Sequence, residues 1–232
     1  MIPIFSNTLG KEELEMVAKV FESRWLGQGT HCTAFEEEFA AYLNTERVLL
    51  TNCCTASLYI ALRALGISDG DEVILSTMNF VACASAVIDA GAIPVYADVN
   101  ERTLNILPSE IARLRTERTK AVILLHYGGY PAPMDEIRNA AEGLLIIEDS
   151  ANSIASRYKG QACGTLGDAG TWSFDAMKML VMGDGGALWL KDEEAHEMAK
   201  AYRYLGLAPK TTSGMDSAGE KNSRWWEYDM AT

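Results

Sequence analysis

The sequence predicts an α/β fold in which a mostly parallel β-sheet is flanked by helices. Short apolar runs with strand character alternate with stretches of helical period over most of the 232 residues. Polar residues directly follow several of these runs, as they do where ligands meet the carboxyl ends of parallel strands. Right-handed βαβ units account for the alternation, because each crossover helix covers the sheet between two parallel strands.

The helical stretches carry apolar residues every three or four positions. In the first of them, Leu14, Val17 and Phe21 share one face. Another begins at Pro108, which suits the first turn of a helix. The predicted helices span residues 11–22, 33–43, 55–65, 80–90, 108–115, 134–141 and 193–204.

The predicted strands are short apolar runs at residues 48–50, 72–76, 93–98, 121–125, 144–148, 169–174 and 186–190. Asn52, Asp98, His126 and Asp149 lie at or just beyond the ends of four of them. Because the carboxyl ends of parallel strands meet at one edge of a sheet, we expect these side chains to gather there. Residues 207–222 are rich in Gly, Ser, Thr and Lys and are predicted to form a loop.

Composition restricts the partners and the compartment. The net charge of −12 argues against nucleic acid and against an acidic membrane surface. No apolar run approaches the roughly 18 residues that cross a bilayer, and the first six residues do not resemble a signal peptide. The five cysteines lack metal-ligand spacing, and the adjacent Cys53 and Cys54 are poorly placed for a disulfide. We therefore expect a reduced cytoplasmic protein without a metal site.

A phosphate-binding segment is predicted at residues 52–58, which follow a strand and open a helix. The free N–H groups and the positive end of that helix converge there, and Thr55 and Ser57 add hydroxyl groups. A simpler interpretation of this segment on its own is that Thr55 caps the helix. Ser173 offers a further hydroxyl group to the same phosphate.

The strongest chemical signal is an apolar run that ends in Glu148–Asp149, followed by an aromatic-rich run that leads to Lys178. A carboxylate after four apolar residues is costly unless a partner stabilises it, and a lysine amine forms a Schiff base with an aldehyde. With the phosphate segment, these residues predict a pyridoxal 5′-phosphate site. Asp149 would keep the pyridine nitrogen protonated and Lys178 would hold the aldehyde. Taken singly, Asp149 is also explained as a helix cap and Lys178 as a surface lysine.

Three neighbouring features complete the predicted site. The apolar residues 179–182 lead us to expect that Lys178 is buried. Phe80 follows a strand, from where its ring can cover one face of a cofactor, although most aromatic residues in such places belong to the core. Asn152 can hydrogen-bond the cofactor's ring oxygen, or it only stabilises the turn after Asp149.

With these residues in place, the chain closely resembles the sugar aminotransferases of the DegT/DnrJ/EryC1/StrS family, which are fold-type I pyridoxal-phosphate enzymes. The most diagnostic segments are Glu148–Asp149 and Ser173–Phe174 with Lys178. Other matching segments are Trp25–Gly29, Thr103–Ile106, His126–Gly129 and Tyr158–Gly160. The resemblance implies an aspartate-aminotransferase-like large domain that works as a homodimer, with its site at the subunit interface.

Carried over position by position, the resemblance also implies a role for each site residue. Lys178 would hold the cofactor covalently and later move a proton, and Asp149 would pair with the pyridine nitrogen. Phe80 would stack on the ring, and Asn152 would lie near its hydroxyl group. The phosphate would be bound by Thr55, Ala56 and Ser173.

The cofactor surroundings depart from the family pattern without losing a catalytic group. Cys53–Cys54 replaces a small residue and a glycine before the threonine, and Asp175–Met177 replaces a proline- or threonine-containing approach to the lysine. Val181–Met182 replaces small polar residues, and Asn152 stands where glutamine or histidine is usual.

The resemblance implies transfer of an amino group from an amino acid, L-glutamate by family precedent, to a nucleotide-linked ketosugar. Family members continue into a small C-terminal domain, so residues 1–232 are expected to form the large cofactor-binding domain of a truncated chain. Two alternatives stay open. One is a pyridoxamine-phosphate-dependent sugar dehydratase, although the known dehydratase lineages replace the lysine. The other is a cofactor-binding regulator or inactive paralogue, which would explain the altered phosphate segment.

Overall fold

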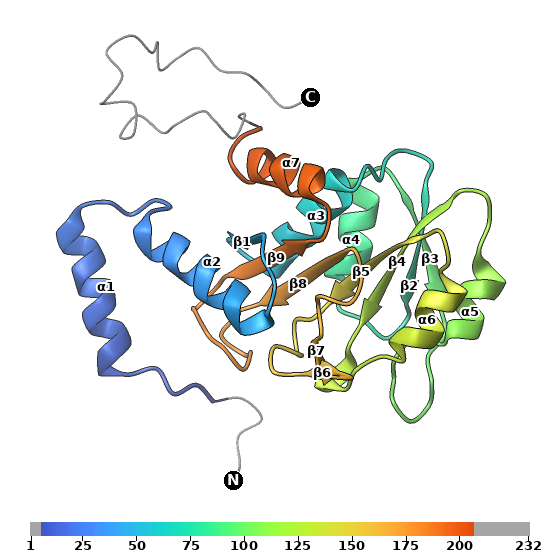
Figure 1. Cartoon of the computed structure of the whole chain (residues 1–232), viewed down its shortest axis with the longest axis horizontal. Coiled ribbons are helices and arrows are strands. Elements are labelled where there is room, and N and C mark those ends of the chain that lie inside the picture. The colour runs from blue at the N-terminus through green and yellow to red at the C-terminus, as the bar shows by residue number, and fades with distance from the viewer. Residues whose placement is uncertain (1–5, 207–232) are drawn as a thin grey trace.

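A seven-stranded sheet forms the centre of the structure, a computed structural model that describes residues 6–206 (Figure 1). In spatial order, its strands are β1 (Val48–Thr51), β9 (Gly186–Leu190), β8 (Ala169–Ser173), β5 (Leu145–Asp149), β4 (Thr119–Leu125), β2 (Glu72–Ser76) and β3 (Ile93–Ala97). β9 runs antiparallel to both neighbours, whereas the other pairs in this sheet are parallel. The predicted mostly parallel α/β sheet is confirmed.

The reversal at β9 follows from the connection that precedes it. Residues 174–185 lead from β8 to β9 without a crossover helix, and a chain that turns back directly pairs in the antiparallel sense. Between β1 and β5, in contrast, each connection contains a helix, as parallel neighbours require.

Helices cover both faces of the sheet (Figure 1). One face carries α3 (Cys54–Ala64), α4 (Ala82–Asp89) and α7 (Glu193–Arg203), and the other carries α2 (Thr30–Leu43), α5 (Pro108–Leu114) and α6 (Met134–Ala140). Successive residues of β4 point to alternate sides. Ala121 and Ile123 belong to the core under α3 and α4, and Val122 and Leu124 belong to the core under α5 and α6.

The predicted helices and strands are present, with ends that differ by up to three residues. α4 begins at Ala82 rather than Phe80, because the Asn79 side chain accepts a hydrogen bond from the Phe80 N–H at 2.7 Å and Val81 forms the cap. The sequence does not predict the hairpin of β6 (Arg157–Tyr158) and β7 (Gln161–Ala162), since two-residue strands are too short to show a period. The predicted loop at 207–222 lies outside the described residues.

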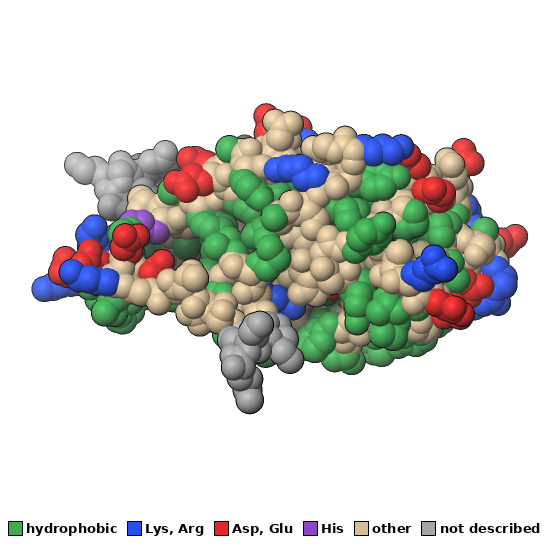
Figure 2. All heavy atoms as spheres, turned by 90° about the horizontal axis from the view of Figure 1, so that it is seen from below, with side chains coloured by type: hydrophobic (Ala, Val, Ile, Leu, Met, Phe, Trp, Pro, Cys, Tyr) green, Lys and Arg blue, Asp and Glu red, His purple; other side chains and the backbone are tan. Residues whose placement is uncertain are grey.

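The first helix, α1 (Lys11–Ser23), has the predicted apolar face but does not bury it. Leu14, Val17 and Phe21 are exposed, and none of the residues of α1 is buried. Figure 1 places this helix at one end of the molecule, beyond α2. Other hydrophobic side chains reach the surface on the face seen in Figure 2, where charged residues gather toward the two ends. Over residues 6–206, no helix combines the length and apolarity needed to cross a bilayer.

β8 packs closely against the loop that leads to it. A Cβ atom at Gly170 would lie 1.8 Å from the carbonyl oxygen of Gly164. A backbone carbonyl cannot rotate aside as a flexible side chain does, so this contact between loop and strand requires glycine at position 170.

We expect Gly170→Ala to lower the free energy of unfolding by about 3 kcal/mol, because overpacking forces the backbone to shift. Gly10→Ala is the control, since its new Cβ would meet no atom closer than 4.0 Å. Urea denaturation followed by circular dichroism measures both variants. Equal stability of the two would contradict the packing described for β8.

Candidate active site

The carboxyl ends of β4, β5 and β8 lie side by side. Leu125 pairs with Asp149, and Asp149 pairs with Thr171. The backbone N–H of His126 donates to the carbonyl oxygen of Asp149 at 3.3 Å. The expected meeting of His126 and Asp149 is therefore confirmed. Asp98 does not join them, because it follows β3 at the edge of the sheet, three positions from β5.

Strand alternation places the site on the face that α3 and α4 cover. Asp149 points to the same side as Ile147, which packs in the core under these helices, and Ser173 on the neighbouring strand faces the same way. Both helices begin at this edge because they follow β1 and β2, which end there. Thr55 at the start of α3 and Phe80 just before α4 therefore lie at the same edge of the sheet as Asp149.

Asp149 is a buried carboxylate with 4% of its surface exposed. Its Oδ1 accepts a hydrogen bond from the Ala151 N–H at 3.0 Å, and its Oδ2 accepts one from the Cys83 thiol at 3.3 Å. Burial raises the pKa of Asp149 above its usual value, whereas these two donors and the positive charge of Lys178 act in the opposite direction. A cationic N–H group placed against this carboxylate would stabilise its charged form.

Lys178 lies near Asp149, in the turn between β8 and β9. Its Nζ donates to Oδ1 of Asn152 at 3.2 Å, so the structure brings two predicted site residues into contact. The expected burial of Lys178 is wrong. Met179 and Leu180 are exposed and Lys178 is half-buried, because residues 175–184 extend beyond the strand ends, where the described chain supplies no layer to cover them.

The start of α3 has a different cap from the one considered from the sequence. The sulfur of Cys53 accepts a hydrogen bond from the Ala56 N–H at 3.4 Å and caps the helix. The alternative in which Thr55 is the cap is therefore wrong. Ser57 is buried, and its hydroxyl group is engaged with that of Thr51 at 2.7 Å. Of the two hydroxyl groups predicted for the phosphate segment, Thr55 is the better placed.

Gly186 brings Ser173 close to this helix start. It pairs with Ser173 on one side and with Thr51 on the other. A Cβ atom at Gly186 would lie 2.4 Å from the carbonyl carbon of Cys53, so only glycine lets β9 pass this closely. Ser173 and the first residues of α3 therefore flank the same glycine, which is the arrangement that a shared phosphate site needs.

Phe80 is a surface residue, with 72% of its area exposed. The alternative in which it belongs to the core is therefore wrong. Cys83, three residues further along, reaches Asp149, so Phe80 is about one helical turn from a residue in contact with the buried carboxylate. Its stacking role stays a prediction.

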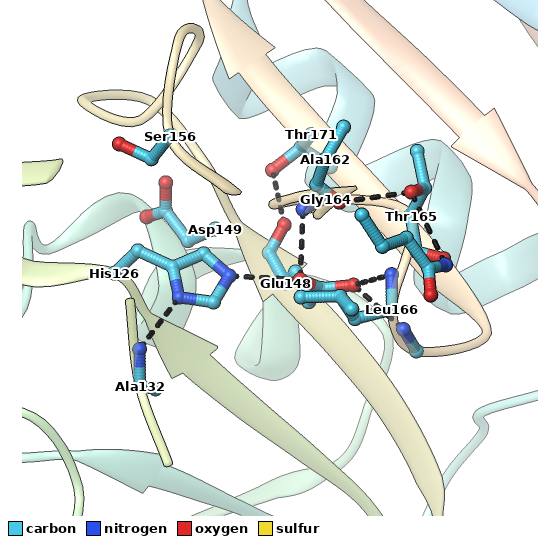
Figure 3. Close-up of polar contacts among 12 residues, drawn as sticks. His126, Ala132, Glu148, Asp149, Ser156, Ala162, Gly164, Thr165, Leu166 and Thr171 are labelled. Atoms are coloured by element: carbon cyan, nitrogen blue, oxygen red, sulfur yellow. Dashed lines mark hydrogen bonds and ion pairs between the residues drawn. The ribbon is translucent and has the colours of Figure 1, made fainter. Parts of the chain in front are cut away.

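A buried network centred on Glu148 adjoins the site, and sequence reasoning does not find it (Figure 3). The Oε1 atom of Glu148 accepts from the N–H groups of Leu166 and Gly167, each at 2.6 Å. Its Oε2 atom contacts the Gly164 N–H at 2.7 Å and Nε2 of His126 at 2.8 Å. The carboxylate is fully buried, and four donors occupy both oxygens. A lone charge inside an apolar strand is the one signal that could have revealed it.

The two contacts of the His126 ring determine its tautomer. Nδ1 faces the backbone N–H of Ala132 at 3.0 Å, so Nδ1 must be the acceptor of that hydrogen bond. The ring proton therefore sits on Nε2 and is donated to Glu148. In this way His126 fastens the chain after β4 to the strand that ends in Asp149 (Figure 3).

The fold and the site define a class of protein: an α/β domain with a lysine, a buried carboxylate and a helix start gathered at the carboxyl edge of a parallel sheet. The model of the DegT/DnrJ/EryC1/StrS aminotransferase family matches residues 7–224. The chain belongs to this family.

Individual relatives agree with this assignment. The dTDP-4-dehydro-2,3,6-trideoxy-D-glucose 4-aminotransferase of Saccharopolyspora spinosa is 46% identical over 231 residues, which cover 98% of this chain and 59% of that protein. The aminotransferase TlmJ from Streptoalloteichus hindustanus has a TM-score of 0.90 at 43% identity, with 100% and 60% of the two chains covered. Spr1654 from Streptococcus pneumoniae, solved in its PLP form, has a TM-score of 0.86 at 27% identity, with 100% and 61% covered.

The predicted aspartate-aminotransferase-like fold is therefore confirmed. The chain spans about three fifths of the length of the relatives that it matches.

We expect Glu148→Gln to lower the free energy of unfolding by about 3 kcal/mol, because the new NH2 group would face N–H donors and leave them unpaired. Glu110→Gln is the matched control, since Glu110 forms a surface ion pair with Arg113 and should matter little. Thermal and urea denaturation compare the two variants. A loss at position 148 no larger than the loss at position 110 would contradict the structural importance of the buried carboxylate.

Proposed function

We propose that the chain is the cofactor-binding part of a pyridoxal-phosphate-dependent aminotransferase that acts on a nucleotide-linked ketosugar. One observation carries this proposal: Lys178 contacts Asn152 close to the buried Asp149, on the face where α3 and α4 begin. The name of the Saccharopolyspora spinosa relative, a 4-aminotransferase of a dTDP-linked sugar, supports both the reaction and the substrate class.

The residues present fit the cofactor. A phosphate group suits the start of α3, where the positive helix end lies near Thr55, Ala56 and Ser173. The Ala56 N–H, which here donates to the Cys53 sulfur, would turn to the phosphate instead. A protonated ring nitrogen suits Asp149, whose oxygens each have one donor from the chain and room for another. When bound, pyridoxal phosphate supplies the electron sink that lets an amino group leave one carbon and join another.

Each residue then has a defined task. Asp149 would hold a proton at the ring nitrogen through a charge-assisted hydrogen bond. Lys178 would hold the aldehyde carbon covalently, and its free amine would move a proton between carbon centres. Asn152 would orient the lysine amine and the ring hydroxyl group, and Phe80 would cover one face of the ring and exclude water from it.

The proposal extends to the partners. L-glutamate is the proposed amino donor, and a second copy of the chain is the proposed subunit partner in a homodimer. Exposed apolar side chains near the site support such an interface, among them Phe80, Val81 and Met179. All five cysteines are free thiols, which supports a cytoplasmic location. Residues 1–232 are proposed to form the large cofactor-binding domain.

Amine transfer is favoured over the dehydratase alternative by Lys178 itself. The family resemblance implies that the dehydratase lineages replace this lysine, whereas here its amine is present and in contact with Asn152. The regulator alternative is separated from catalysis by experiment, because a regulator would bind the cofactor without turning over an amino donor.

The test is an absorbance titration of the purified protein with pyridoxal phosphate, followed by addition of L-glutamate. We expect saturable binding with visible colour, and glutamate should bleach that colour. Borohydride reduction followed by peptide mass spectrometry should then place the cofactor on the Lys178 peptide. Lys178→Ala should lose both the colour and the label, because it removes the amine that holds the aldehyde.

Lys191→Ala is the matched control, since Lys191 lies on the surface and pairs with Asp168. This variant should keep the colour, the label and the glutamate response. A label on the Lys159 or Lys191 peptide would contradict the role of Lys178. Colour that glutamate cannot change would support the regulator alternative instead of an aminotransferase.

A further inference from the structure

Two buried groups meet on the side of Asp149 that faces α4. Cys83 lies in the first turn of that helix and has no exposed surface. Its sulfur is 3.3 Å from Oδ2 of Asp149. An ionised carboxylate only accepts hydrogen bonds, so the thiol is the donor.

Cys83 and Ala151 each donate a hydrogen bond to a different oxygen of the Asp149 carboxylate. Ala151 donates to Oδ1 from the turn that follows β5, only two residues from Asp149. This bond therefore does not fix the carboxylate relative to another element of the fold. Cys83 donates to Oδ2 from a helix packed against the sheet. The thiol is therefore the contact that fixes the carboxylate relative to α4, and Phe80 lies just before that helix.

We propose that Cys83 is a positioning residue whose thiol holds Asp149 in the orientation that receives the protonated ring nitrogen of the cofactor. This inference rests on the proposed function. Each carboxylate oxygen can accept two hydrogen bonds, so the bond from Cys83 leaves room for the ring N–H. A thiol is also slim enough to fit the dry interface between α4 and β5, where Cys83 packs among Val87, Ile123 and Ile147.

The sulfur acts as a hydrogen-bond donor rather than as a nucleophile. Burial raises the pKa of Cys83 well above its usual value, and the negative charge of the neighbouring Asp149 adds to this effect. The sulfur therefore keeps its proton at neutral pH, and that proton is what Asp149 requires.

The contact is tested first on the protein without cofactor, by infrared spectroscopy of the S–H stretch. A thiol that donates to a charged oxygen absorbs at lower frequency than a thiol in an apolar core. We expect Cys83→Ala to remove a low-frequency band and Asp149→Asn to move the same band upward. Cys163→Ala is the control, because Cys163 is equally buried but packs in the core on the other face of the sheet. A Cys83 band that Asp149→Asn leaves unmoved would overturn the proposal.

The positioning role is tested by the affinity for pyridoxal phosphate. Cys83→Ala should weaken binding by about three- to tenfold, as expected for loss of one hydrogen bond of ordinary strength, because a thiol is a weak donor. Cys83→Ser should restore most of the affinity, because a hydroxyl group donates to the same oxygen. A role in packing alone gives the opposite order, since serine is less compatible than alanine with an apolar interface. Cys163→Ala controls for the cavity that a lost thiol leaves.

Wild-type affinity in Cys83→Ala, or weaker binding by Cys83→Ser than by Cys83→Ala, would overturn the positioning role. If the wild-type protein does not bind pyridoxal phosphate at all, the proposed function fails and the positioning role fails with it. The infrared measurement separates the two cases, because it decides whether Cys83 donates to Asp149 without any cofactor.

Discussion

The rest of the described structure depends on the hydrogen bonds that the buried carboxylate of Glu148 accepts. The N–H groups of Leu166 and Gly167 saturate one oxygen, and Gly164 and His126 saturate the other. Moving a charge out of water costs several kcal/mol, and four charge-assisted hydrogen bonds offset that cost. They also fasten the loop before β8 and the residue after β4 to the end of β5. The three strands that carry the site therefore end in a fixed relation to one another.

The alternation of side chains along β5 separates the structural carboxylate from the carboxylate of the candidate site. Glu148 and Asp149 are adjacent, so they point to opposite faces of β5. The first is saturated by the protein, whereas the second has one donor on each oxygen and faces the starts of α3 and α4. A slip of β5 by one residue would move Glu148 to the face that Asp149 occupies and Asp149 to the opposite face. The site therefore requires this register of the sheet. Lys178 and Asn152 complete the arrangement from the segments after β8 and β5.

The sequence is sufficient for the sheet and the helices, because their signals are local, namely the apolar period and the turn residues between runs. It also indicates the candidate site residues through their positions at the ends of strands, and their roles stay predictions. It does not reveal Glu148 or Cys83 as organising residues, since their partners are distant in sequence: the loop 164–167 for one and Asp149 for the other. The sequence also does not predict that Cys53, rather than Thr55, caps α3, because sulfur is not a usual capping acceptor. The apolar neighbours of Lys178 do not say whether any layer covers them, and the expected burial of this lysine is wrong for that reason.

A crystal structure of the protein with pyridoxal phosphate tests most directly whether Asp149, Lys178 and the start of α3 form one cofactor site. We expect the phosphate at the N–H groups that open α3, the ring nitrogen within hydrogen-bonding distance of Asp149, and continuous density from Nζ of Lys178 to the cofactor. A phosphate bound away from α3, or a ring nitrogen that faces a residue other than Asp149, would contradict this arrangement.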